Sequence, residues 1–171
     1  MTEGTAARVE VRVGGRLRAA GYTLATAESC TGGLVASWVT DVPGASDYFD
    51  RGVVTYAYDA KRELLGVTRE ALDEQGAVSE PVARQMARRV RDLSGTTWGL
   101  AVTGIAGPTG GTPEKPVGTV YLGVAYAAEW GSEASYAEVE RHEFEGGRTA
   151  VKSAAADGAL ELLLSHVESR R

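Results

Sequence analysis

The residues best suited to chemistry lie in the stretch from Leu24 to Gly33. The apolar run Thr23 to Ala27 predicts a buried strand, and the apolar residues from Leu34 to Val39 have helical spacing. A sharp turn from strand to helix would hold Ser29 at the sheet edge, beside the amides of the helix start. A serine in that place could act as a nucleophile with an oxyanion site. Because serine and threonine before a helix usually cap it, the pattern alone leaves both roles open.

A nucleophilic serine needs a base, and Lys61 is the candidate. A lysine packed against the sheet would lose solvation, its pKa would fall, and it could then take a proton from a serine. Tyr56 precedes Lys61 at the end of a predicted strand, where its hydroxyl could relay or orient a proton. Most lysines are solvated, so these two residues alone do not establish a site.

A second stretch with chemical potential is the glycine-rich loop from Thr103 to Gly111, which leaves a predicted strand. Such a loop lets backbone amides approach an anion, as in phosphate sites. The loop lacks the lysine of a P-loop and does not match the dinucleotide fingerprint. A mobile surface loop and a phosphate site therefore both remain open.

Metal chemistry has little support in the sequence. The two histidines, His142 and His166, are far apart and outside the spacings typical of metal ligands. A Cys30–His142 nucleophile pair is conceivable, although Cys30 is better interpreted as a small packing residue beside Ser29. We expect neither a metal nor a cofactor.

The composition narrows the class of protein. The chain has 171 residues with a net charge of −5, which gives no electrostatic footprint for nucleic acid. One cysteine cannot form an internal disulfide, no signal peptide is evident, and no apolar run could span a bilayer. We expect one cytoplasmic domain over residues 1–171, with no nucleic-acid or membrane partner.

The patterns further along the chain alternate between strand and helix. Ser79 is a predicted helix cap, and four arginines of the helix that follows are interpreted as solvent-exposed: Arg84, Arg88, Arg89 and Arg91. Helices are predicted at 6–20, 34–39, 59–65, 80–93 and 149–167, and strands at 23–27, 52–56, 98–102, 118–126 and 136–144. The last two strands could form a hairpin. This order predicts an α/β fold, a three-layer α/β/α sandwich with a mixed central sheet.

The chain resembles the C-terminal domain of the competence/damage-inducible protein CinA. The similarity spans almost the whole chain in the right order, and its first and fourth blocks are highly specific. The blocks are Thr26 to Gly33, Gly52 to Tyr56 with Lys61, Gly76 to Pro81, Thr103 to Pro108, Lys115 to Val120, and Phe144 to Arg148.

The stand-alone members of that family are nicotinamide-nucleotide amidohydrolases. The resemblance implies metal-free deamidation of nicotinamide mononucleotide to nicotinic acid mononucleotide and ammonia. Ser29 matches the family's nucleophile, Lys61 and Tyr56 match its activating pair, and Thr103 and Arg148 match positions that shape or bind in the site. The resemblance also suggests a homodimer. Larger family proteins carry an N-terminal nucleotide-processing domain, for which we expect no room here.

One departure is local, because Ala57-Tyr58-Asp59 stands where family members often have Ser-Asn after the tyrosine. Residues and resemblance together predict an amidase in which neutral Lys61, helped by Tyr56, deprotonates Ser29. Amides near Thr31 to Gly33 are the expected oxyanion donors. Substrate-binding residues are predicted at Thr31, Gly32, Gly33, Thr103, Gly104, Gly107 and Arg148, with the 5′-phosphate on Arg148 and the Thr103 to Gly111 loop.

Two alternatives belong to other classes of protein. The chain could be a nucleotide-binding or regulatory module without turnover, or an interaction protein of competence or DNA repair. The acidic balance argues against direct DNA contact. The presence of Ser29, Tyr56 and Lys61 together argues against an inactive site.

Overall fold

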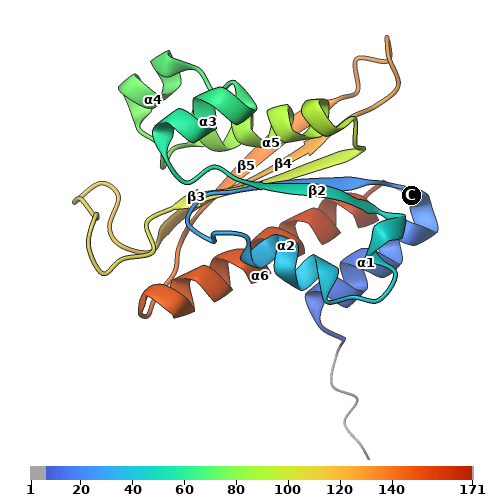
Figure 1. Cartoon of the computed structure of the whole chain (residues 1–171), viewed down its shortest axis with the longest axis horizontal. Helices are drawn as coiled ribbons and strands as arrows, with labels where there is room; N and C mark the ends of the chain where they lie inside the picture. The colour runs from blue at the N-terminus through green and yellow to red at the C-terminus, as the bar shows by residue number, and fades with distance from the viewer. Residues whose placement is uncertain (1–6, 171) are drawn as a thin grey trace, which may run out of the picture.

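Five strands form one mixed sheet in the order β2-β1-β3-β4-β5 (Figure 1). The computed structural model describes residues 7–170. β1 pairs in parallel with β2 and β3, whereas β4 runs antiparallel to both β3 and β5. The bounds are β1 Leu24–Glu28, β2 Phe49–Val54, β3 Trp98–Gly104, β4 Thr119–Tyr126 and β5 Tyr136–Glu143. The mixed sheet and the late hairpin predicted from the sequence are confirmed.

Helices cover both faces of this sheet (Figure 1). The helices are α1 Val9–Ala20, α2 Leu34–Thr40, α3 Tyr58–Leu65, α4 Arg69–Gln75, α5 Glu80–Ser94 and α6 Arg148–Glu168, with a short 3₁₀ turn, η1, at Ala45–Asp47. α1, α2 and α6 pack together on one face, and α3, α4 and α5 pack together on the other. The three-layer α/β/α sandwich is therefore confirmed.

Each face of the sheet has its own apolar core. The larger core joins Trp98, Leu100 and Leu122 to the helices α1, α2 and α6, and the smaller one joins Ala25 and Ala101 to α5. α5 lies close to the sheet because glycines face it: a Cβ on Gly99 would lie 2.2 Å from the carbonyl oxygen of Ala87. The strands between the two cores are buried on both sides, which matches their apolar character.

Strand β2 differs from its predicted bounds of 52–56. It begins at Phe49, pairs with β1 from Leu24↔Phe49 to Glu28↔Val54, and ends at Val54. β2 ends where β1 ends, because a parallel ladder needs a partner strand. Tyr56 therefore lies in the loop before α3 rather than at a strand end.

Two local features were missed or misinterpreted in the sequence. Helix α4 was not predicted, because only Ala71 and Leu72 of this short helix are buried and its apolar period is weak. Its cap is Thr68, whose side chain accepts a hydrogen bond from the Ala71 amide at 3.2 Å. Ser79 stands at the first position before α5 but does not cap it: its hydroxyl donates to the carbonyl oxygen of Gly76 at 2.8 Å.

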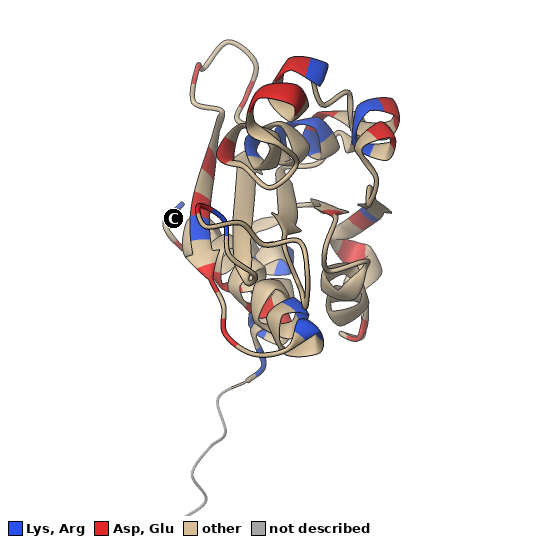
Figure 2. Ribbon diagram, turned by 90° about the vertical axis from the view of Figure 1, so that its left-hand side faces the viewer, with Lys and Arg blue, Asp and Glu red and all other residues tan. Residues whose placement is uncertain are grey.

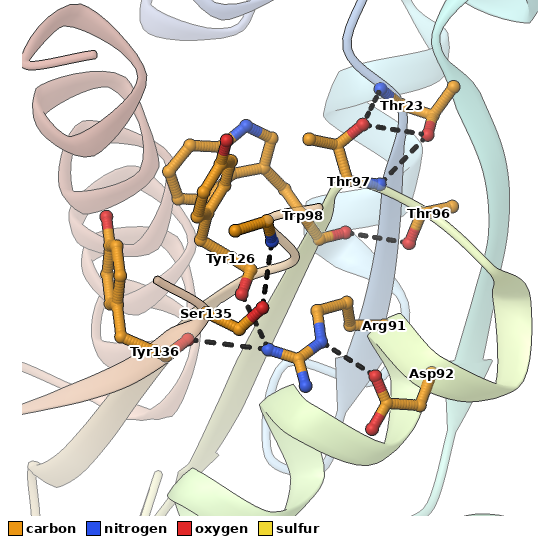
Figure 3. Close-up of polar contacts among 10 residues, drawn as sticks. Thr23, Arg91, Asp92, Thr96, Thr97, Trp98, Tyr126, Ser135 and Tyr136 are labelled. Atoms are coloured by element: carbon orange, nitrogen blue, oxygen red, sulfur yellow. Dashed lines mark hydrogen bonds and ion pairs between the residues drawn. The ribbon is translucent and has the colours of Figure 1, made fainter. Parts of the chain in front are cut away.

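The interpretation of the α5 arginines as solvent-exposed was wrong for Arg91, which is buried, and for Arg84, which is half-buried. The side chains of these two and of Arg89 reach backbone carbonyls beyond the helix. Arg84 donates to the Ala137 carbonyl, Arg89 to that of Leu65 at 2.8 Å, and Arg91 to that of Tyr126 at 2.7 Å, as Figure 3 shows for Arg91. A long, planar and always charged side chain suits such carbonyls. Arg88 and Arg89 are exposed as expected, and among the described residues Arg88 has no protein partner. On the face in Figure 2, basic and acidic residues are interspersed over the helices.

Candidate active site

Ser29 follows β1 directly and begins the turn that leads into α2. Its amide donates to the Val102 carbonyl oxygen of β3 at 2.9 Å, which ties the residue to the centre of the sheet. Gly32 and Gly33 have φ values of +60° and +102°, which favour glycine, so the chain can reverse within this turn. The strand, turn and helix predicted around Ser29 are all present.

The side chain of Lys61 reaches Ser29 from α3, which covers the face of the sheet opposite α2. Its side chain is 0% exposed, and its Nζ lies 2.8 Å from the Ser29 Oγ. The Nζ also lies 2.7 Å from the carbonyl oxygen of Thr55 and 3.1 Å from that of Tyr56. Carbonyl oxygens only accept hydrogen bonds, so a neutral amine would give both of its hydrogens to them. Its lone pair would then face the Ser29 hydroxyl, which is the geometry of a general base.

Burial makes the neutral amine accessible near physiological pH. Removal of the Lys61 ammonium from water lowers its pKa from 10.5 to about 8. Among residues 7–170, no carboxylate forms an ion pair with Lys61 that would keep it charged. A lysine with such a pKa can take a proton at a pH where an ordinary lysine cannot.

Tyr56 and Arg148 meet at the mouth of the site. The Tyr56 ring is 59% exposed, and its hydroxyl accepts a hydrogen bond from Arg148 Nη2 at 2.9 Å. Arg148, the first residue of α6, also donates from Nη1 to the Gly107 carbonyl oxygen at 2.6 Å. The contact of Lys61 with Tyr56 uses the backbone carbonyl and not the phenol. Arg148 therefore joins the loop before α3 to the glycine-rich loop after β3.

These residues surround a small cavity of about 170 Å³. Cavities of about 150 Å³ can accept a benzene ring, so this one has room for a single six-membered aromatic ring. Ser29, Lys61, Thr103 and Arg148 supply polar groups, and Ala77, Val78 and Ala106 supply apolar wall. The full lining is Ser29, Cys30, Tyr56, Lys61, Ala77, Val78, Thr103, Gly104, Ala106 and Arg148.

The structure places the other predicted site residues differently. Thr103 and Gly104 line the cavity, and the Thr103 hydroxyl donates to the Ala77 carbonyl oxygen at 2.8 Å. Thr31, Gly32 and Gly33 belong to the turn that follows Ser29 and are not among the residues that line the cavity, and Gly107 contributes the carbonyl that holds Arg148. Thr103 thus has a structural partner of its own in the wall of the cavity.

The wall residues Ala77 and Val78 fall within the similar block Gly76 to Pro81 but were not predicted as site residues. They lie between α4 and α5, and the Ala77 amide donates to the Tyr58 hydroxyl at 3.2 Å. Tyr58 belongs to the segment that departs from the family's usual Ser-Asn. The departure thus supplies a hydroxyl that holds the cavity wall. Small apolar residues in a loop carry no chemistry of their own, so their place in the cavity wall becomes apparent only from the fold.

Not all amides near Ser29 are available to an oxyanion. Val35 and Ala36 donate to the Glu28 carboxylate, at 2.8 Å to Oε1 and 3.0 Å to Oε2, and Gly32 donates to the Ser29 carbonyl oxygen at 3.0 Å. Within residues 7–170, the amides of Cys30, Thr31 and Gly33 have no protein acceptor. The range of donors expected from the sequence therefore narrows, and Gly32 is excluded. Glu28, which is 1% exposed, fixes α2 against β1, a role that sequence reasoning missed.

Two further properties concern the described part of the chain. No three His, Cys, Asp or Glu side chains in it gather where they could hold a metal ion. Of the helices within residues 7–170, none combines the length and the apolar character that crossing a membrane requires.

The sequence matches the family model of the CinA C-terminal domain over residues 6–167. A CinA-like protein from Salinibacter ruber is 51% identical over 153 residues, which are 90% of this chain and 35% of that protein. A CinA-like protein from Geobacter sulfurreducens is 50% identical over 155 residues, which are 91% of this chain and 36% of that protein. The chain spans about a third of the length of these two relatives.

Solved structures agree with this match. The competence/damage inducible protein CihA from Agrobacterium tumefaciens superposes with a TM-score of 0.86 at 40% identity, covering 92% of both chains. The competence damage-inducible protein A (ComA) from Klebsiella pneumoniae superposes with a TM-score of 0.88 at 33% identity, covering 95% of this chain and 97% of that one. The chain belongs to the CinA C-terminal domain family.

Proposed function

We propose that this protein hydrolyses the carboxamide of nicotinamide mononucleotide to give nicotinic acid mononucleotide and ammonia. The observation that carries the proposal is the Lys61 amine, 2.8 Å from the Ser29 hydroxyl and held by two backbone carbonyls. A buried amine so oriented serves to activate a serine, and a serine nucleophile suits acyl transfer. The resemblance supplies the substrate, and a cavity sized for one aromatic ring suits its pyridine ring.

In the first half of the reaction, Ser29 Oγ attacks the carboxamide carbon while neutral Lys61 takes the hydroxyl proton. The oxyanion receives hydrogen bonds from the amides of Cys30 and Thr31, which no protein group occupies. The C–N bond then breaks, and the Lys61 ammonium returns its proton to the leaving nitrogen, which departs as ammonia. The product of this half is an ester between Ser29 Oγ and the carboxyl carbon of nicotinic acid mononucleotide, with the ribose phosphate still on the pyridine ring.

In the second half, water replaces ammonia in the cavity. Neutral Lys61 takes a proton from that water as it attacks the ester carbon, and the tetrahedral intermediate collapses with protonation of Ser29 Oγ by Lys61. Nicotinic acid mononucleotide leaves, and Lys61 and Ser29 are regenerated. Tyr56 and Arg148 form the mouth through which the substrate enters. The reaction needs no metal and no cofactor, and we retain the homodimer as part of the proposal.

The names of the relatives favour a second candidate function. The structural neighbours are named competence or damage-inducible proteins, and these names describe no reaction. In that case the cavity would bind a nucleotide without turnover, or the domain would act through a protein partner.

The two candidates are separated by ammonia release from nicotinamide mononucleotide. We expect turnover by the wild-type protein, loss of at least about 10³-fold in Ser29→Ala, and little change in Ser37→Ala, a matched serine exposed on α2. Acid-quenched wild-type protein should carry the acyl group of nicotinic acid mononucleotide on the peptide with Ser29. Binding of the nucleotide without ammonia from the wild-type protein would favour the module without turnover.

A further inference from the structure

The chain contains only three lysines, and each lies close to the site. Lys61 contacts Ser29, and the Lys115 Nζ donates to the Gln75 carbonyl oxygen at 2.6 Å, next to the wall formed by Ala77. Lys152 lies on α6 with its Nζ 4.0 Å from where a Cβ on Gly32 would stand, so it faces the nucleophile turn. Within residues 7–170, the Lys152 ammonium has neither a carboxylate partner nor a hydrogen-bond acceptor.

The other cation of this helix is already engaged. Arg148 precedes Lys152 by four residues, so both side chains project from the same face of α6. Arg148 donates to the Gly107 carbonyl oxygen and to the Tyr56 hydroxyl, at 2.6 Å and 2.9 Å. To bind a phosphate with those two nitrogens, it would have to release both partners. Lys152 could bind a phosphate without giving up any hydrogen bond to the described residues.

The charge of Lys152 acts on Cys30, the residue next to Ser29. Burial raises the pKa of Cys30 to about 11, and the nearby ammonium groups of Lys61 and Lys152 oppose part of that rise. Lys152 therefore lies within electrostatic range of the residue next to Ser29. Gly32 is exposed and has no side chain, which leaves the space beside the ammonium open.

The size of the cavity decides where a phosphate would lie. A volume of about 170 Å³ holds the pyridine ring, so the ribose and phosphate of the substrate must lie outside, at the mouth. One side of the mouth is Tyr56 with Arg148, and the turn at Gly32 lies beside Lys152.

We propose that Lys152 is a specificity residue that binds the phosphate monoester of the substrate beside the Gly32 turn. This proposal rests on the proposed deamidation of a nucleotide. A flexible ammonium group is a common partner of phosphate, and an ion pair with it is made in both the ground state and the transition state. Lys152 then distinguishes the nucleotide from the nucleoside, while Arg148 positions Tyr56 and the Gly107 loop for both.

The test compares ammonia release from nicotinamide mononucleotide and from nicotinamide riboside. Lys152→Gln should lower kcat/KM for the mononucleotide by roughly ten- to a hundredfold, mainly through KM, and change the riboside less than about twofold. Lys152→Arg should restore most of the loss. Arg88→Gln removes the same charge from the far layer and should change neither substrate. Arg148→Ala should lower both substrates alike.

Equal losses for both substrates in Lys152→Gln, or no loss for either, would overturn the proposal. Failure of the proposed function is seen separately, as absence of ammonia from both substrates with the wild-type protein. In that event, calorimetry with inorganic phosphate tests the residue alone. Weaker binding by Lys152→Gln than by the wild type and Arg88→Gln supports an anion subsite, and equal binding rejects it.

Discussion

Lys61 and Arg91 are both cations buried by the fold, and they lie at opposite ends of the sheet. Lys61 is 0% exposed and contacts only neutral oxygens, those of Ser29, Thr55 and Tyr56. Arg91 is 9% exposed and donates to the Asp92 carboxylate at 2.8 Å and to the Tyr126 carbonyl oxygen at 2.7 Å (Figure 3). The buried cation at one end of the sheet therefore has a carboxylate partner, whereas the one at the other end contacts neutral oxygens.

The difference separates a group that reacts from a group that holds the fold. A guanidinium keeps its proton throughout the accessible pH range, and a carboxylate partner offsets part of its desolvation. The Arg91 end is thus fixed by a permanent charge that ties α5 to the β4–β5 hairpin. Among the described residues Lys61 has no carboxylate partner, and burial lowers its pKa to about 8, so that the proton becomes exchangeable.

Exchanging lysine and arginine at positions 61 and 91 should give the largest effect on kcat/KM, and it should do so at position 61. Lys61→Arg keeps the positive charge but cannot give up a proton, so kcat/KM should fall by on the order of 10²–10⁴-fold, nearly as far as in Lys61→Ala. The matched change at the other end, Arg91→Lys, should leave kcat/KM within about threefold and lower the free energy of unfolding by about 1–3 kcal/mol. Ammonia release and urea unfolding measure the two effects.

An active Lys61→Arg protein would break the comparison. Lys61 would then supply charge alone, as Arg91 does, and the base would have to lie elsewhere, with Tyr56 the next candidate.

The pH dependence should give the next largest effect. Only the neutral amine accepts the Ser29 proton, so kcat/KM should fall as the pH decreases below about 8, the pKa that burial gives Lys61. The fall should approach tenfold per pH unit, so that activity at pH 6 is about a hundredfold below the plateau. Tyr56→Phe should lower the plateau without moving this limb. A limb that persists unchanged in Lys61→Arg would show that another group titrates.

The sequence alone was sufficient for the layers of the fold and for the turn that carries Ser29. Both depend on local patterns: apolar runs for β1 and β3, and glycines for the turn between β1 and α2. Lys61 was identified as a candidate by residue type and resemblance. The contact between Lys61 and Ser29 depends on β1 and β2 ending at the same level of the sheet. Local sequence patterns do not predict this alignment.

The parts that the sequence could not supply are long-range partners of side chains. Arg91 was interpreted as exposed because its helical neighbours are polar, yet it reaches two carbonyls from other elements. Among the amides expected to hold the oxyanion, that of Gly32 donates to the Ser29 carbonyl oxygen, and the buried Glu28 takes up those of Val35 and Ala36 further along. The sequence did not predict a binding role for Lys152, because that role depends on its proximity to Gly32. The two residues are far apart in the sequence and adjacent in the structure.

The smallest effect is expected at Cys30, which shares the surroundings of Lys61. Burial favours the neutral form of any group, so the same desolvation that lowers the pKa of Lys61 to about 8 raises that of Cys30 to about 11. At pH 8 only about one Cys30 in a thousand is a thiolate, and the thiol should be inert. Cys30→Ala should keep kcat/KM within about threefold, and iodoacetamide should label Cys30 in urea but not in the folded protein.

Rapid labelling of the folded protein with loss of activity, together with an active Ser29→Ala, would move the nucleophile one residue along the turn. The comparison of buried cations would then describe a base that serves a thiol instead of a serine.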